Sequence, residues 1–289
     1  MDRDAFAQSL QDLRADRTHG AAELAGRAMD VLEESARGAA VTDGAALKRE
    51  LDWRAGALAE ARPGMMPLAN LTRRFRADLD ALDPADPGSL RRDAAAAARR
   101  LRDVARTAAE QAADNAAAAI SAGSTLLLHS ESSTVRRVLH RLVGHDVRAI
   151  VTESRPRDEG RSVAARLAAW GFAVDLVPDA AVGLMADRAD LALVGADTLL
   201  PDGGVVNKAG TFPLALACRA AGVPFCVVSK SFKQRPGDMP PPDNEADDPG
   251  LLHPPAGVTG VNWLFDTTPA RLVAWWYDEH GAHRGPAAP

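Results

Sequence analysis

Residues 190–233, DLALVGADTLLPDGGVVNKAGTFPLALACRAAGVPFCVVSKSFK, constrain the fold more than any other part of the chain. Two apolar runs of strand length, Leu191–Val194 and Phe225–Val228, flank a helical pattern that begins near Gly210 and ends at Gly222. Buried apolar strands joined through a helix are typical of a parallel sheet. The segment therefore predicts an α/β fold whose ligand site lies at the carboxyl ends of the strands, where open α/β sheets bind ligands.

The same alternation of strands and helices begins at Gly123. Strands are expected at 125–128, 147–152, 173–177, 191–194 and 225–228, with a late one near 261–264. Helices are expected at 133–143, 160–170, 180–187, 211–221 and 269–279. Residues 234–257 are rich in proline and acidic residues, which predicts a mobile loop.

Residues 1–122 have a helical pattern instead. Apolar side chains recur at spacings of three and four, as in Phe6, Leu10 and Leu13, and a long alanine-rich helix follows Pro87-Gly88. The predicted organisation is a helical N-terminal domain, 1–122, followed by a Rossmann-like parallel-sheet domain, 123–289.

The composition excludes several classes of protein. The net charge is −5, whereas proteins that bind nucleic acids in general carry an excess of basic residues on one surface. No direct nucleic-acid partner is therefore expected. No apolar run reaches the roughly 20 residues that cross a bilayer, and the charged amino terminus does not resemble a secretory signal. We therefore expect no membrane partner and a cytoplasmic protein. Cys218 and Cys226 lack metal-ligand spacing and are expected to be reduced core residues.

Several site chemistries are also disfavoured. The first strand is followed by HSESS rather than GxGxxG, and GGVVNKAGT does not match the P-loop pattern. His129 and Ser130 are neighbours on a strand and should point to opposite faces, which disfavours a Ser–His pair. The histidines lack zinc spacing. The sequence thus predicts neither a cofactor nor a metal.

Polar residues that follow the strands form the candidate site. They are Ser130, Ser132, Arg155, Asp197, Asn207, Lys208 and either Lys230 or Lys233. Cations and amides outnumber acids, which favours a phosphorylated sugar as the ligand. Asp197 ends a buried strand, so it is either a hydrogen-bonded structural group or a general acid/base.

These motifs resemble a known family. GAD, GGVVNKAGT and VPFCVVSKSFK, together with DRTHGAAELA, ARPGMMPLANL, LLLHSESSTV and VTESRPRDEG, are similar to motifs of the family that unites the α, β and δ subunits of translation initiation factor 2B with aldose-phosphate isomerases. Those isomerases act on methylthioribose 1-phosphate or ribose 1,5-bisphosphate. The α-subunit-like members are the most similar by motif.

The resemblance implies roles for particular residues. Asp197 matches the isomerase acid/base, while Ser130 stands where the isomerases have a cysteine, and Glu159 replaces a glutamine. Further substrate contacts are implied at His19, Gly20, Ala21 and Arg62, with His19 in place of an isomerase arginine.

Two functions follow from these observations. The favoured one is a regulatory, initiation factor 2B-like protein that binds a sugar phosphate or a nucleoside monophosphate. The alternative is an aldose–ketose isomerase acting on ribose 1,5-bisphosphate or methylthioribose 1-phosphate, and a purely structural subunit is a third class. A homodimer is expected through the C-terminal domain, because one helix over 269–279 could not turn all of the apolar side chains of the final segment toward the sheet; these are Leu264, Phe265, Leu272, Val273, Trp275 and Trp276. Related subunits are further possible partners.

Overall fold

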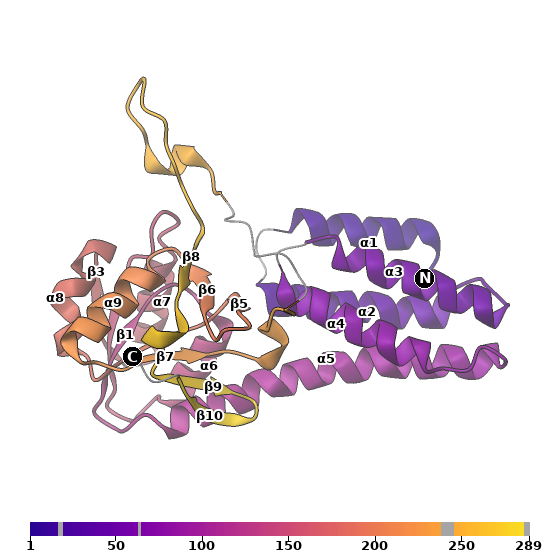
Figure 1. Ribbon diagram of the computed structural model, residues 1–289, viewed down its shortest axis with the longest axis horizontal. Coiled ribbons are helices and arrows are strands. Elements are labelled where there is room, and N and C mark those ends of the chain that lie inside the picture. The colour runs from indigo at the N-terminus through magenta and orange to yellow at the C-terminus, as the bar shows by residue number, and fades with distance from the viewer. Residues whose placement is uncertain (17–19, 63–64, 238–245, 286–289) are drawn as a thin grey trace. The chain divides into compact units, whose positions relative to one another are not determined.

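The computed structural model describes residues 1–16, 20–62, 65–237 and 246–285 (Figure 1). The chain divides into two compact units, Met1–Thr107 and Ala108–Pro289, and each is described by itself. The predicted domain boundary between residues 122 and 123 stays a prediction.

The first unit is helical, as expected. Its helices are α1 (Arg3–Ala15), α2 (Ala21–Gly38), α3 (Gly44–Ala59), α4 (Met66–Asp80) and the first part of α5 (Pro87–Ala118). Leu24, Leu51 and Phe75 are fully buried in its core. The guanidinium of buried Arg54 donates to Ser35 Oγ at 2.9 Å. This hydrogen bond offsets part of the free-energy cost of burying the charge.

The second unit is built on a largely parallel sheet, which confirms the predicted α/β fold class. Among the described residues, this main sheet has seven strands in the order β10-β9-β7-β4-β1-β2-β3. Their bounds are β1 (Thr125–Leu128), β2 (Arg148–Thr152), β3 (Ala173–Val177), β4 (Leu191–Val194), β7 (Phe225–Val228), β9 (Trp275–Asp278) and β10 (Gly281–Arg284). β10 alone among these strands pairs antiparallel, against β9.

Helices cover both faces of this sheet. The last part of α5, α6 (Ser133–Arg141) and α7 (Glu159–Ala169) bury one face, and α8 (Val182–Met185) and α9 (Thr211–Ala221) bury the other. The helix expected at 180–187 is wrong as a single helix, because α8 is flanked by 3-10 turns at Asp179–Ala181 and Ala186–Arg188. In the described part of the chain, no helix has the length and apolarity needed to cross a membrane.

A small antiparallel sheet lies beyond the carboxyl ends of the main strands. It consists of β5 (Thr198–Leu199), β6 (Val205–Lys208) and β8 (Phe265–Thr268). The late strand was expected at 261–264 within the parallel sheet. That expectation is wrong, because the strand begins at Phe265 and belongs to the small antiparallel sheet. β8 pairs with β6, and Asp266 of β8 accepts hydrogen bonds from the backbone of Gly210 and Phe212 at the start of α9.

The helix predicted at 269–279 is also wrong. Ala270–Leu272 forms a 3-10 turn, and β9 and β10 form a hairpin on the edge of β7. Aromatic residues such as Trp275-Trp276-Tyr277 are favoured in strands. The edge of β7 offers backbone N–H and C=O groups that pair with this run, so it forms a strand rather than a helix.

The prediction of a mobile loop at 234–257 is not tested. Residues 238–245 lie outside the described part of the chain. Beyond them, Ala246 bridges to Trp263, and Pro249–Leu252 forms a 3-10 turn in the orange-to-yellow extension seen in Figure 1.

Candidate functional site

The chain turns sharply where β1 ends. Ser130 has φ of +67°, a left-handed conformation uncommon outside glycine. Its backbone N–H donates to Ser154 Oγ at 2.7 Å, which holds the turn against the end of β2. Ser132 then caps α6 by accepting from the backbone N–H of Val135 at 3.4 Å. The two predicted serines therefore lie together at the carboxyl edge of the sheet.

His129 is a buried structural group, with 3% of its surface exposed. Its Nε2 lies 2.9 Å from the carbonyl oxygen of Ala209 and its Nδ1 lies 2.6 Å from Thr152 Oγ1. Burial lowers the pKa of His129, so the ring is neutral at pH 7. Because a carbonyl only accepts, Nε2 carries the proton and Nδ1 accepts from Thr152. Both ring nitrogens are thereby occupied within the protein.

Gly210 is required by this contact with His129. It has φ of +107°, and a Cβ at this position would lie 2.7 Å from the His129 ring. The close approach brings the β6–α9 turn, with Lys208, up to the end of β1.

Ser130, Glu159 and Lys208 form a hydrogen-bonded polar cluster at this edge. Ser130 Oγ donates to Glu159 Oε1 at 3.2 Å, and Lys208 Nζ lies 3.0 Å from the same oxygen. Only 10% of the Lys208 side chain and 23% of the Glu159 side chain are exposed. Glu159 Oε2 is buried and accepts no hydrogen bond from a described residue. The cluster combines a hydroxyl, a carboxylate and an ammonium.

Asn207 supports the backbone beside this cluster. It is 6% exposed, and its Nδ2 donates to Thr211 Oγ1 at 3.0 Å, while Thr211 Oγ1 donates to the Lys208 carbonyl at 2.6 Å. These bonds fix the turn that presents Lys208.

Asp197 and Lys233 occupy the same edge, beyond β4 and β7. Asp197 is half-buried, and Lys233 donates to the carbonyl oxygen of the neighbouring Ala196. Burial lowers the pKa of Lys233, and the nearby carboxylate of Asp197 opposes that shift. Gly195 lies against Ser132, since a Cβ on Gly195 would be 2.4 Å from Ser132 Oγ. The geometry therefore places β4 and the start of α6 in direct contact at the site.

Lys230 is a second buried lysine, only 3% exposed. Burial, together with the positive charges of Lys233 and Arg137, lowers its pKa to about 7. Between these two lysines, Lys233 is the one whose charge interacts with Asp197.

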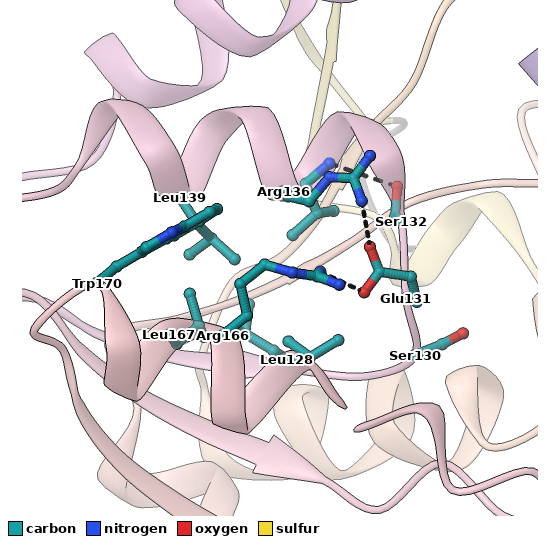
Figure 2. Close-up of a pocket in the computed structure, with 11 residues that line it drawn as sticks. Leu128, Ser130, Glu131, Ser132, Arg136, Leu139, Arg166, Leu167 and Trp170 are labelled. Carbon is teal, nitrogen blue, oxygen red and sulfur yellow. Dashed lines mark hydrogen bonds and ion pairs between the residues drawn. The ribbon is translucent and has the colours of Figure 1, made fainter. Parts of the chain in front are cut away.

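A narrow pocket opens between α6 and α7 next to Ser130 (Figure 2). Figure 2 shows the Glu131 carboxylate between two guanidinium groups, at 2.7 Å from Arg166 and 3.6 Å from Arg136. The apolar wall of the pocket consists of Leu128, Val135, Leu139, Val163, Leu167 and Trp170. Because the Glu131 carboxylate occupies the space between the two guanidinium groups and the rest of the wall is apolar, this pocket suits a small apolar group better than a phosphate. Within the described residues, no group of three or more His, Cys, Asp or Glu side chains could hold a metal ion.

Comparison with known proteins decides the family. A model of the Initiation factor 2 subunit family matches residues 17–284. The chain belongs to this family.

Relatives within the family fall into two groups. A ribose 1,5-bisphosphate isomerase from Haloterrigena turkmenica is 31% identical over 296 residues, which cover 96% of this chain and 89% of the relative. A putative translation initiation factor eIF-2B subunit 2-like protein from Pyrococcus horikoshii is 37% identical over 157 residues, or 52% of this chain and 54% of that one. The crystal structure of the Pyrococcus horikoshii translation initiation factor eIF-2B is 27% identical, with a TM-score of 0.79 over 100% of this chain and 98% of that chain. The predicted resemblance is confirmed.

In this member of the initiation factor 2 subunit family, Arg155 does not contact the cluster of Ser130, Glu159 and Lys208. Its exposed guanidinium pairs with Asp158 at 3.2 Å and reaches the carbonyl of Leu251, while its backbone N–H donates to Asp179 at 2.7 Å. None of these contacts involves Ser130, Glu159 or Lys208, so its predicted role in binding stays a prediction.

The remaining predicted residues belong to the helical unit. His19 lies outside the described residues, Gly20 caps α2, and Ala21 is the first residue of that helix. Arg62 donates to the Asp16 carbonyl at 2.6 Å. Their roles as ligand contacts stay predictions.

Glu159 is the site residue that sequence reasoning missed. It was noted only as a replacement for a glutamine, yet it bonds both Ser130 and Lys208. Its position at the start of the helix that follows β2 was the available signal, because such residues lie at the carboxyl edge of a parallel sheet.

Proposed function

We propose that this protein binds a phosphorylated pentose, or a nucleoside monophosphate, at the carboxyl ends of β1, β4 and β7. The observation that carries the proposal is the placement of two lysine side chains, the buried Lys208 and the half-buried Lys233, at one edge of the sheet. Desolvated cations interact strongly with phosphate. The start of α6, behind Ser132, adds backbone N–H donors at the same edge. A regulatory role beside related subunits is favoured by the likeness to eIF-2B subunits.

Aldose–ketose isomerisation is the second candidate function. It is favoured by the cluster of Ser130, Glu159 and Lys208, which adds a carboxylate to the cations, and by the likeness to a ribose 1,5-bisphosphate isomerase over 96% of the chain. A carboxylate that exchanges protons beside a cation that stabilises negative charge is what such a reaction requires.

Thermal denaturation tests binding directly. The protein is mixed in turn with ribose 1,5-bisphosphate, methylthioribose 1-phosphate, ribose 5-phosphate and a set of nucleoside monophosphates. A ligand present at ~100 Kd stabilises by roughly 2.7 kcal/mol, and ribose without phosphate should give no shift. Ketose formation is then assayed with every ligand that binds. If no phosphate ester shifts the transition, the proposed function is wrong.

A homodimer and a cytoplasmic location remain proposals. The helix that motivated the dimer is absent, and Val273 and Trp276 pack against the core of the α/β unit. Trp275 stays 39% exposed on β9, next to the edge strand β10. An exposed aromatic side chain beside a free edge is typical of an interface.

Light scattering at micromolar concentration measures the mass. We expect twice the chain mass of 30.4 kDa, and Trp275→Glu should shift the protein toward the monomer because a carboxylate is costly at a dry interface. A wild-type mass of one chain would rule out the dimer. Leu184→Glu, at an exposed position on α8, is the matched control and should leave the mass unchanged.

A further inference from the structure

We propose that Glu159 is the catalytic base that removes the proton from C2 of a pentose phosphate. The proposal rests on the isomerase function described above as the second candidate. It gives a role to a carboxylate that lies within the polar cluster at the strand ends.

The backbone of Glu159 is held in place by its neighbour. Glu159 is the first residue of α7, and a Cβ on the following Gly160 would lie 1.8 Å from the Thr152 carbonyl oxygen. The start of α7 is therefore packed directly on the end of β2, where only glycine fits. A catalytic group on such a rigid support needs little reorganisation to react.

The side chain of Glu159 is also oriented. Oε1 accepts from Ser130 Oγ at 3.2 Å and pairs with Lys208 Nζ at 3.0 Å. Oε2 has no hydrogen-bond donor among the described residues, although it is buried. A buried acceptor without a donor is uncommon and calls for an explanation. The unpaired Oε2 keeps its lone pairs, and because the side chain as a whole is 23% exposed, rotation about its last bond brings them to a substrate at the exposed side of the cluster.

Neighbouring groups are less suited to this step. Both nitrogens of His129 are already hydrogen-bonded inside the protein. The hydroxyl of Ser130 is a weak base unless another group removes its proton, and its hydrogen already points to Glu159. Lys208 is a cation that stabilises negative charge developing on the substrate. Glu159 is therefore the base that this cluster provides.

The reaction of a pentose 1-phosphate in its ring form balances with Glu159 as base and with Asp197, once it has taken a proton from solvent, as acid. Glu159 takes the C2 proton, the C2–H electron pair forms a C1=C2 double bond, and the bond from C1 to the ring oxygen breaks. The ring oxygen takes a proton from Asp197 and becomes the C4 hydroxyl. The enol then returns its O2 proton to Asp197, the C2 carbonyl forms, and C1 takes the proton held by Glu159. Both residues recover their starting states, and no oxidant or reductant is consumed.

The test is Glu159→Gln, which keeps the shape of the side chain but removes its basicity. Ketose formation from ribose 1,5-bisphosphate, and entry of deuterium at C1 in D₂O, should both fall about 10²- to 10⁴-fold. The thermal shift produced by the substrate should persist, which shows that the variant folds and binds. Glu153→Gln is the matched control, because Glu153 lies just after β2 and pairs with Arg161 outside the cluster. It should retain full activity.

Glu159→Asp gives a second measure. It keeps the carboxylate but shortens its reach, so its rate should fall between those of wild type and Glu159→Gln. Rates in Glu159→Gln within about twofold of wild type would overturn the role of Glu159 and leave isomerase activity standing. Wild-type protein that binds the substrate but gives neither ketose nor deuterium at C1 would overturn the isomerase function, and the role of Glu159 with it.

Discussion

Replacement of Asp197 by asparagine is expected to lower ketose formation by about 10²- to 10⁴-fold, the usual contribution of a general acid or base. Asparagine is nearly isosteric, so the backbone hydrogen bond from Asp197 N–H to the Val206 carbonyl at 2.9 Å should remain. The amide cannot give a proton to the ring oxygen. Steady-state turnover with ribose 1,5-bisphosphate measures the effect, and unchanged turnover would remove Asp197 from the mechanism.

The same substitution has a consequence for stability that depends on pH. The Asp197 carboxylate opposes the burial-induced lowering of the pKa of Lys233, so its removal should lower that pKa further. A charged lysine is then less favourable in the folded state than in the unfolded one. The resulting loss of stability should be present below the folded-state pKa of Lys233 and should vanish as pH rises through it, because the lysine is then neutral in both folded proteins while the unfolded chains titrate alike. Urea denaturation over a pH series up to about 10.5 measures the difference between wild type and Asp197→Asn.

Replacement of Lys208 by alanine is expected to weaken ligand binding by about 1.5–3 kcal/mol, the value of a charge-assisted hydrogen bond. The variant should also lose stability without ligand. Lys208 is 8% exposed, and its removal leaves the largely buried Glu159 carboxylate without its ion-pair partner. The full cost of breaking a buried pair is about 3–5 kcal/mol, and partial exposure of Glu159 should reduce it to about 1–3 kcal/mol. Thermal shift titration and urea denaturation measure the two effects.

A double variant separates the two contributions of Lys208. Lys208→Ala combined with Glu159→Gln removes the unpaired carboxylate, so stability should recover while affinity stays low. Arg161→Ala is the control for an ion pair outside the cluster. Its side chain is 58% exposed, and its loss should cost under about 1 kcal/mol. Normal ligand affinity in Lys208→Ala would show that the phosphate binds elsewhere.

Some elements could be predicted closely from the sequence. β1, β4, β7 and α9 begin and end at the residues expected from the apolar runs and from the glycines that flank them. Each is a short buried strand or an amphipathic helix, so local pattern alone decides its state. The same reasoning expected Ser130, Asp197 and Lys208 at the carboxyl edge of the sheet, where the structure has them, and their roles in binding or catalysis stay predictions.

Other elements could not be predicted in this way. Trp275-Trp276-Tyr277 was assigned to a helix because its apolar residues also fit a helical face, and the free edge of β7 decided for a strand. The position of Glu159 at the start of α7 could be expected, but its bond to Lys208 could not, because Lys208 comes from a strand pair formed by β6 with the distant β8. These contacts join residues far apart in the chain.

The sequence by itself therefore determined the family, the α/β class and the edge of the sheet that holds the polar residues, because these follow from local patterns and ordered motifs. The tertiary structure alone decided which of those residues bond to one another. Lys208 pairs with Glu159, whereas Arg155 turns to Asp158. The physical reason is that pairing between charged side chains depends on distances of 3–4 Å, which only long-range packing of the strand ends can set.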